Sequence, residues 1–205
     1  YEDINFRFED KLKLNHNKIL EFNEWILKNN IQEIFEAREI FSIYFDTKNL
    51  QTYHDSTEGL LPRTKLRLRT YNFKSLVENK FNIEIKKSVN YGRLKSSKKL
   101  ENIEKALRYG IYMKNYGFCY PKIIIKYERI YYKLKNIRIT LDKNIQFKKY
   151  SKFLEKGKFD QTCNLVVAEI KYSSKKELTN LFNELPFEIT RFSKYCMGLE
   201  SLNLL

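Results

Sequence analysis

The sequence predicts a single α+β domain over residues 1–205, whose strands carry charged residues on one face and apolar residues on the other. Two patterns predict this fold class. Six segments alternate between charged and apolar residues, as half-buried strands do. Between them, apolar residues recur at helical spacing. No shift in composition, internal repeat or low-complexity linker divides the chain, which favours one domain.

The predicted strands follow one another along most of the chain. In the first, residues 6–14, charged side chains at odd positions oppose Phe6, Phe8, Leu12 and Leu14. The same alternation returns in five later segments, and a β-rich composition adds a further strand before the first of these five. These later strands are predicted at 40–46, 63–71, 81–87, 123–131, 137–142 and 164–172.

Helices are predicted between the strands. Asn15 is a candidate N-cap for a helix over residues 16–29, in which Trp25 belongs to the apolar side that faces the core. Helical spacing also predicts a helix over 100–116 and another over 175–185, the latter stopped by Pro186. Loops are expected near residues 50–62, 88–98 and 157–162.

The chain is strongly basic. Its 39 Lys and Arg against 25 Asp and Glu give a formal net charge of +14, which indicates an anionic partner. Nucleic acid, an anionic membrane surface and a phosphate-rich small molecule all satisfy that condition. No apolar run reaches the roughly 20 residues of a membrane helix, and three widely spaced cysteines form neither a disulfide framework nor a zinc site. We therefore expect no membrane segment in this chain and a reducing, cytoplasmic location.

The positions of the charges narrow the choice of partner. Because like charges on neighbouring strands repel, a sheet face that collects so many cations requires a compensating anion such as polyphosphate. An open sheet would offer these cations to nucleic acid, whereas a closed barrel with helices outside would enclose them. The matched strand faces carry four acids, Glu9, Glu84, Asp142 and Glu169, and ten cations: Arg7, Lys11, Lys13, Lys65, Arg67, Arg69, Lys86, Arg129, Arg138 and Lys171.

The sequence lacks the residues that most other kinds of catalysis require. The sequence contains no GxxxxGK[ST] phosphate loop and no GxGxxG motif, and its only histidines are His16 and His54. Phosphoryl transfer remains, because it requires mainly positioning, cations and a metal ion. The strand faces supply cations for phosphate and carboxylates for Mg²⁺ or Mn²⁺.

Short motifs in order along the chain resemble one family, the polyphosphate polymerase domain of the vacuolar transporter chaperone complex and its bacterial relatives. This family is a branch of the triphosphate tunnel metalloenzymes. The resemblance covers nearly the whole chain, and its motifs are Arg7-Phe8-Glu9-Asp10-Lys11, Ile43-Tyr44-Phe45-Asp46-Thr47, Lys65-Leu66-Arg67-Leu68-Arg69-Thr70-Tyr71, Glu84-Ile85-Lys86, Tyr127-Glu128-Arg129, Arg138-Ile139-Thr140-Leu141-Asp142, Glu169-Ile170-Lys171 and Arg191-Phe192-Ser193-Lys194-Tyr195.

The resemblance implies a closed antiparallel eight-stranded β-barrel, a triphosphate tunnel lined by basic residues, with helices packed outside. It implies a transferase that moves the γ-phosphate of ATP, or of another triphosphate, onto inorganic polyphosphate and releases ADP. A tri- or polyphosphate hydrolase of the same fold is the first alternative. The second is a non-catalytic module that binds polyphosphate or RNA, although no specific nucleic acid is expected.

The resemblance also assigns site residues. The catalytic cations it implies are Arg67, Arg69, Lys86, Arg129, Arg138 and Lys194. Further phosphate contacts are expected from Lys11, Lys95, Lys171 and Ser193. Glu169 resembles the glutamate that binds Mn²⁺ or Mg²⁺, and Glu9 is a second candidate ligand.

The sequence departs from the hydrolase branch in its first strand. The Glu-x-Glu-x-Lys motif of that branch needs an acid at position 7, which is occupied by Arg7, and this favours the polymerase branch. For three other acids we expect structural roles: a salt bridge for Glu84, a turn for Asp46, and an Asx turn at a strand end for Asp142.

Overall fold

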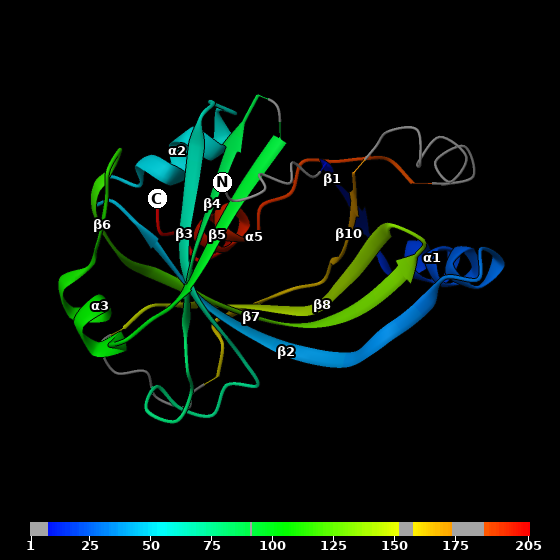
Figure 1. Ribbon diagram of the computed structural model, residues 1–205, viewed down its shortest axis with the longest axis horizontal. Helices are drawn as coiled ribbons and strands as arrows, with labels where there is room; N and C mark the ends of the chain where they lie inside the picture. Colours follow the sequence, from blue (N-terminus) through cyan, green and yellow to red (C-terminus); the bar gives the residue numbers. More distant parts are fainter. Residues whose placement is uncertain (1–7, 91, 152–157, 174–186) are drawn as a thin grey trace. The chain divides into compact units, whose positions relative to one another are not determined.

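A computed structural model describes residues 8–90, 92–151, 158–173 and 187–205 (Figure 1). Their helices are α1 (His16–Lys28), α2 (Gln51–Thr57), α3 (Ile103–Tyr109) and α5 (Lys194–Ser201). Their strands are β1 (Phe8–Leu14), β2 (Gln32–Asp46), β3 (Arg63–Tyr71), β4 (Asn82–Val89), β5 (Gly92–Lys99), β6 (Ile111–Met113), β7 (Gly117–Leu134), β8 (Ile137–Lys149), β9 (Gln161–Cys163) and β10 (Val166–Tyr172). Arg7 and the predicted helix 175–185 lie outside the described residues.

The α+β class with an antiparallel sheet is confirmed, but the closed eight-stranded barrel is wrong. Ten strands form one sheet in the order β1-β10-β8-β7-β2-β3-β4-β5, with β6 added to β7 and β9 to β8, and the two ends of this path do not pair. The edge of β1 is used instead by a later segment, since Thr190 N donates to Lys11 O at 2.8 Å and Leu12 bridges Ile189. The edge strand β5 exposes several lysines, which disfavour pairing with a further strand.

The chain divides into two compact units. Unit 1 comprises Tyr1–Arg38, Tyr127–Ile145 and Cys163–Phe192, and unit 2 comprises Glu39–Lys126, Gln146–Thr162 and Ser193–Leu205. Strands β2, β7, β8 and β9 contribute residues to both. The prediction of one domain over residues 1–205 stays a prediction.

The core of unit 1 lies between α1 and the apolar faces of β1, β8 and β10. Asn15 caps the helix as predicted, because its side chain accepts a hydrogen bond from Lys18 N at 3.0 Å. Phe22, Trp25 and Ile26 then turn inward against the strands. The helix buries the apolar side of each strand, which leaves the charged side of β1, β8 and β10 facing away from α1.

The core of unit 2 is built on the apolar faces of β2, β3 and β4, covered by α3 and the β6–β7 hairpin. The predicted helix 100–116 is too long, because α3 ends at Tyr109. Gly110 ends it with φ +80°, a conformation that favours glycine, and a Cβ atom there would lie 2.7 Å from Cys119 O. The chain can therefore reverse at this point and enter β6.

Candidate functional site

In unit 2, strands β3, β4 and β5 bring three lysines into one row. Lys65 lies directly opposite Lys86, and Lys86 lies directly opposite Lys95. Arg67 and Arg69 follow on the same face of β3, because alternate residues of a strand share a face. Neighbouring like charges destabilise a sheet unless an anion compensates them, so this cation face is suited to a phosphate chain.

Glu84 is the anion that the chain itself supplies on this face. Its Oε2 accepts hydrogen bonds from Arg67 Nε at 2.9 Å and Nη2 at 2.7 Å, and lies 3.5 Å from Arg69 Nη1. Its Oε1 accepts from Lys95 Nζ at 2.7 Å. Burial acts to raise the pKa of Glu84, but Arg67, Arg69 and Lys95 outweigh burial and hold that pKa at about 2. Glu84 is therefore ionised at neutral pH, and the expected salt bridge is present.

This pairing predicts an acid-sensitive step in stability. Because the pKa of Glu84 falls from about 4.5 when unfolded to about 2 when folded, its stabilisation is complete above pH 4.5 and is lost as pH falls towards 2. We expect the unfolding free energy of the native chain to drop over this range by roughly 3 kcal/mol more than that of Glu84→Gln. Urea unfolding at a series of pH values measures both. The exposed Glu78→Gln is the control, and equal pH slopes for native chain and Glu84→Gln would contradict the assignment.

Arg67 is also held from its other side by Tyr44, for which the sequence predicted no role. Its Nη1 donates to the Tyr44 hydroxyl at 2.8 Å, and the Tyr44 ring stacks on Tyr195 with centroids 5.4 Å apart. The Tyr195 hydroxyl donates to Asp46 Oδ2 at 2.6 Å. Burial and the charge of Asp46 both raise the pKa of Tyr195, so it remains a donor. A chain of contacts thus fixes the guanidinium of Arg67 before any ligand arrives.

Asp46 has the turn-forming role expected of it. Its carboxylate accepts hydrogen bonds from the backbone N–H groups of Thr47, Thr52 and Tyr53, at 2.7, 2.9 and 3.0 Å. These contacts join the end of β2 to α2, and the bond from Tyr195 ties α5 to the same point.

Helix α5 brings the predicted Ser193 to the cation face of unit 2. Ser193 is the N-cap of α5, and its hydroxyl accepts a hydrogen bond from Cys196 N at 3.3 Å and another from Lys65 Nζ at 2.7 Å. Lys194, the first residue of the helix, is half-buried. A hydroxyl that accepts a hydrogen bond from a lysine still has its own proton to donate, and Ser193 could donate it to an anion bound at this face.

Unit 1 carries a second set of predicted residues on neighbouring strands. Lys11 lies directly opposite Glu169 across β1 and β10, and Glu9 lies opposite Lys171. Lys11 Nζ lies 3.7 Å from Glu9 Oε1 and 3.9 Å from Glu169 Oε2, and Lys171 Nζ lies 2.5 Å from Glu169 Oε1. Arg138 follows opposite Lys171 on β8 and is exposed. Each acid therefore faces a base across β1 and β10, whereas the cations Lys171 and Arg138 face each other across β10 and β8.

Arg129 forms a buried ion pair that corrects one expectation. Asp142 does not form a turn at a strand end; it lies inside β8, fully buried, and binds Arg129 through both carboxylate oxygens, at 2.5 and 2.7 Å. Burial acts to lower the pKa of Arg129, but Asp142, Tyr127 and Glu169 raise it well above its usual value. The segment 137–142 was predicted too short, which made Asp142 look like a strand end.

The structure thus places the predicted residues in two groups. Unit 2 holds Arg67, Arg69, Lys86, Lys95, Ser193 and Lys194. Unit 1 holds Lys11, Glu9, Arg129, Arg138, Glu169 and Lys171.

Glu9 and Glu169 offer a partial ligand set for a divalent ion. Among the described residues no three His, Cys, Asp or Glu side chains converge as a complete metal site. The two carboxylates nevertheless approach one point, marked by Lys11 Nζ, and the buried Thr140 hydroxyl, directly opposite Glu169, has no hydrogen-bond partner among the described residues. Mg²⁺ and Mn²⁺ are commonly bound by one or two carboxylates together with substrate phosphates and water, so these residues fit such an ion.

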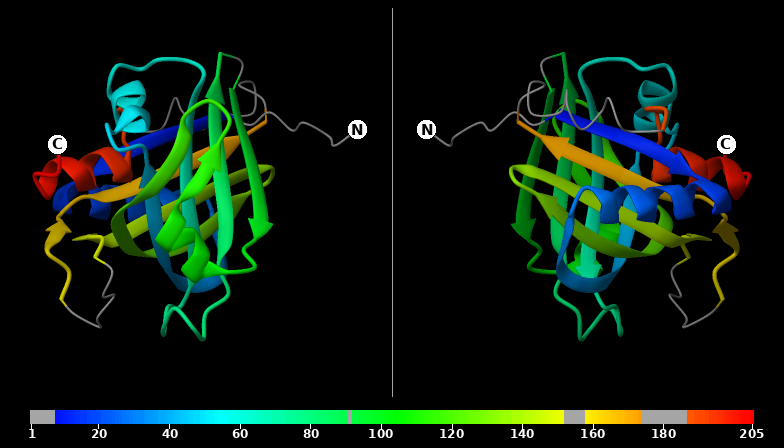
Figure 2. Two further views of the ribbon diagram at one scale, coloured as in Figure 1. Left: turned by 90° about the vertical axis from the view of Figure 1, so that its left-hand side faces the viewer. Right: turned by 90° about the vertical axis from the view of Figure 1, so that its right-hand side faces the viewer.

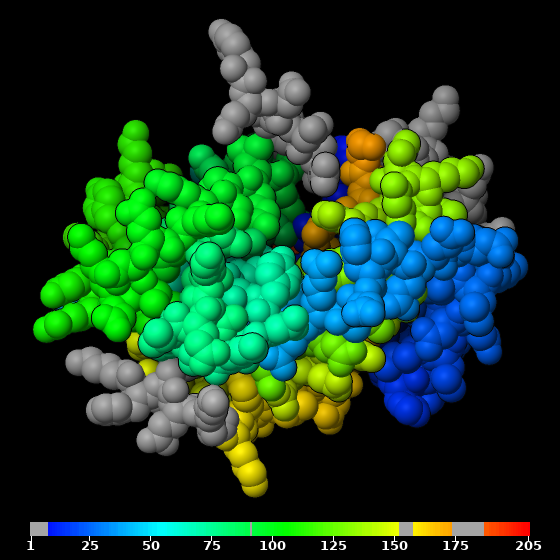
Figure 3. Space-filling model, turned by 60° about the horizontal axis from the view of Figure 1, so that its bottom comes forward, coloured from blue at the N-terminus to red at the C-terminus, as the bar shows by residue number. Residues whose placement is uncertain are grey.

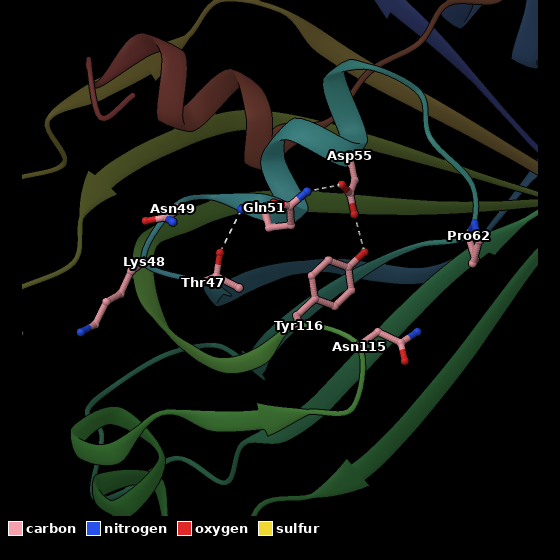
Figure 4. A pocket seen from close by; sticks show the side chains of 8 residues that line it. All are labelled: Thr47, Lys48, Asn49, Gln51, Asp55, Pro62, Asn115 and Tyr116. Carbon is pink, nitrogen blue, oxygen red and sulfur yellow. Dashed lines mark hydrogen bonds between the residues drawn. The ribbon is translucent and has the colours of Figure 1, made fainter.

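A pocket of about 630 Å³ lies elsewhere in unit 2, at the start of α2 (Figure 4). Its polar groups bond to one another: Asp55 accepts hydrogen bonds from Gln51 Nε2 at 2.9 Å and from the Tyr116 hydroxyl at 2.6 Å. Burial and the Asp55 carboxylate raise the pKa of Tyr116 to about 12. None of the predicted phosphate-binding residues lines this pocket, and we assign it a structural role in holding α2 to the β6–β7 turn.

None of the helices in the described part of the chain is long and apolar enough to cross a membrane.

Comparison with known proteins identifies a family and a fold. A family model described as "VTC domain" matches residues 6–203. Similar solved structures include a putative adenylate cyclase from Vibrio parahaemolyticus, with 14% identity, a TM-score of 0.55, and coverage of 94% of this chain and 97% of that chain. No curated protein sequence matches significantly.

Two further structures are similar at comparable levels. A conserved hypothetical protein from Pyrococcus furiosus has 15% identity and a TM-score of 0.56, covering 93% of this chain and 99% of that chain. The third structure is a putative adenylyl cyclase from Hippeastrum, described as having a dominant triphosphatase activity. It has 11% identity and a TM-score of 0.53, and the match covers 95% of this chain and 96% of that chain. At these identities the similarity establishes the fold.

Proposed function

The chain belongs to the VTC domain family, and from this premise we propose that it is a phosphotransferase acting on a triphosphate. The observation that carries the proposal is the row of Lys65, Lys86 and Lys95 across three strands, flanked by Arg67 and Arg69. One carboxylate, Glu84, lies among these five cations. The remaining positive charge suits a ligand with several phosphate groups in series.

The reaction proposed is the transfer of the ATP γ-phosphate to inorganic polyphosphate. The terminal phosphate oxygen of the acceptor chain attacks the γ-phosphorus, the bond between that phosphorus and the bridging β–γ oxygen breaks, and ADP leaves with the electron pair. Arginine forks and lysines stabilise the charge that spreads over the phosphate oxygens in the transition state. Arg67 and Arg69 of unit 2 are assigned this role, and phosphate binding is proposed separately for Arg129 of unit 1.

Glu169, assisted by Glu9, is proposed to hold Mg²⁺ or Mn²⁺. When bound, the ion supplies charge neutralisation on the phosphate oxygens. Lys11 and Lys171, which contact these carboxylates in the absence of ligand, would then turn to phosphate oxygens. The chain's own contribution is to orient the two carboxylates through their contacts with those lysines.

Two features favour transfer to phosphate over hydrolysis. A phosphate acceptor is already anionic, so attack needs no protein base, whereas a water nucleophile must lose a proton. The chain's two histidines, His16 and His54, are both exposed and lie on helices α1 and α2 rather than on the strands that carry the proposed site residues. Arg7 also replaces an acid of the hydrolase motif, as noted above.

Incubation of the chain with ATP and Mn²⁺, followed by gel separation of the phosphate products, tests the proposal. We expect phosphate chains that lengthen with time, with one ADP released per phosphate added. Orthophosphate as the sole phosphate product would instead establish a hydrolase. Salt-dependent binding of polyphosphate without any ADP release would establish a binding module.

A further inference from the structure

The outer face of the β6–β7 hairpin in unit 2 is aromatic. Tyr112 and Phe118 lie directly opposite each other across the two strands, and they are 64% and 54% exposed. Tyr109, at the end of α3, is 57% exposed. The left panel of Figure 2 shows α3 and this hairpin facing the viewer, and Figure 3 shows the same green part of the chain at the surface. We call these three residues the aromatic patch.

The aromatic patch departs from the pattern expected of a hairpin that covers a core. The inner face of the hairpin, with Ile111, Met113 and Cys119, packs into the core of unit 2 as it should. The outer face of such a ribbon is normally polar because it meets water. With aromatic side chains of 150–250 Å² each, three that are more than half exposed present roughly 300 Å² of ring surface. This is comparable to the largest apolar patch on a typical monomer, and such patches are often functional.

Cations flank the residues of the patch in sequence. Lys105 and Arg108 on α3 and Lys114 at the hairpin turn are all exposed. Residues 111–120 contain no Asp or Glu, and the nearest acids in sequence, Glu101 and Glu104, lie at the start of α3. The aromatic patch and its flanking cations complement a surface with an outer layer of negative charge and an apolar layer beneath it. The lysines and the arginine would match the charged layer, and the exposed rings would match the apolar layer.

The geometry of the rings favours a lipid surface over a nucleic acid. Base stacking needs open ring faces, but Tyr112 and Phe118 meet edge to face at 68° with centroids 5.5 Å apart. The Arg108 guanidinium lies over the ring of Tyr109 at 5.4 Å. Each of these contacts covers one face of one ring, which reduces the flat surface open to bases, while ring edges remain available for insertion among lipid headgroups.

We propose that the β6–β7 hairpin docks peripherally on an anionic lipid surface. The rings of Tyr109, Tyr112 and Phe118 enter the boundary between headgroups and acyl chains, and Lys105, Arg108 and Lys114 bind lipid phosphates. This surface consists of residues other than the phosphate-binding cations of unit 2, so the proposal stands apart from the proposed transferase activity.

Sedimentation with vesicles tests the proposal against simple charge attraction, which a net charge of +14 would also produce. The probes are vesicles of phosphatidylcholine alone and vesicles containing 30% phosphatidylserine. At physiological salt we expect Tyr112→Ser together with Phe118→Ser to weaken binding to the anionic vesicles at least about tenfold. Tyr71→Ser removes an aromatic ring outside the patch, 40% exposed at the end of β3, and should leave binding unchanged.

A fluorescent variant reports insertion directly and does not depend on a loss of binding. In Tyr112→Trp, the new indole should shift its emission to shorter wavelength on anionic vesicles, while the buried Trp25 gives a constant background. An unshifted emission, or a double variant that binds as the native chain does, would overturn the proposal. So would binding of a single-stranded RNA that needs Tyr112 and Phe118 when the native chain binds neither type of vesicle.

Discussion

Replacing Arg67 by alanine should lower kcat/KM for the phosphotransferase reaction by about 10²- to 10³-fold, the usual cost of removing one donor to a developing oxyanion. Arg67 is held between Glu84 and Tyr44, by bonds of 2.7 to 2.9 Å. Its orientation is therefore set in advance, and little free energy is spent in ordering it when the transition state forms. Steady-state kinetics with ATP and polyphosphate measure the effect.

The fold should survive this change. Glu84 keeps Arg69 at 3.5 Å and Lys95 at 2.7 Å after Arg67 is removed, so its buried charge stays compensated. Circular dichroism and thermal unfolding of Arg67→Ala should therefore resemble those of the native chain. Arg67→Lys keeps the positive charge but loses the planar guanidinium with its paired N–H donors. We expect its kcat/KM to lie between that of the native chain and that of Arg67→Ala.

Arg108→Ala is the matched control, because it removes an exposed arginine of the same unit that lies far from Glu84 in sequence and on α3. Its turnover should equal that of the native chain. If Arg67→Ala turned over at the native rate, the cation face of unit 2 would not be the phosphate site.

Strand bounds were predicted best where charged and apolar residues alternate strictly along the sequence. Residues 63–71 alternate strictly, and β3 has those same bounds. Strand β5 was predicted as a loop, because Lys95, Ser96, Ser97, Lys98 and Lys99 offer no apolar face; as an edge strand it is stabilised by pairing with β4 rather than by its own burial. Helix α5 was missed for a similar reason, since eight residues are too few to show helical spacing clearly.

The partners of the site residues were less predictable than the residues themselves. Alternation showed that Arg67 and Glu84 occupy charged faces, but register decides that they lie opposite each other, and register depends on distant turns. Tyr44 and Tyr195 are about 150 residues apart in sequence and meet only in the folded unit. Tyr44 lies directly opposite Arg67 across β2 and β3, so its side chain lies on the same face of the sheet as the arginines of β3. The position of Tyr44 in the predicted strand 40–46 was a signal that could have indicated its role.

Asp142→Leu should be the most destabilising single change proposed, with a loss of about 3–5 kcal/mol in unfolding free energy. Asp142 is fully buried and binds the nearly buried Arg129 through both oxygens. Without it, Arg129 would keep a charge that neither water nor a close carboxylate solvates. Arg129→Met alone should cost a comparable amount, because it leaves Asp142 charged and buried. Urea unfolding measures each variant.

Combining Arg129→Met with Asp142→Leu separates stability from catalysis. Two apolar side chains of similar volume need no ion partner, so the double variant should regain most of the stability that either single change loses. Its turnover should remain low, because the Arg129 guanidinium proposed to bind phosphate is gone. If the double variant turned over at the native rate, Arg129 and Asp142 would contribute to stability and not to catalysis. A loss of less than about 1 kcal/mol for Asp142→Leu would show that Arg129 finds another anion, for which the neighbouring Glu169, whose charge already raises the pKa of Arg129, is the candidate.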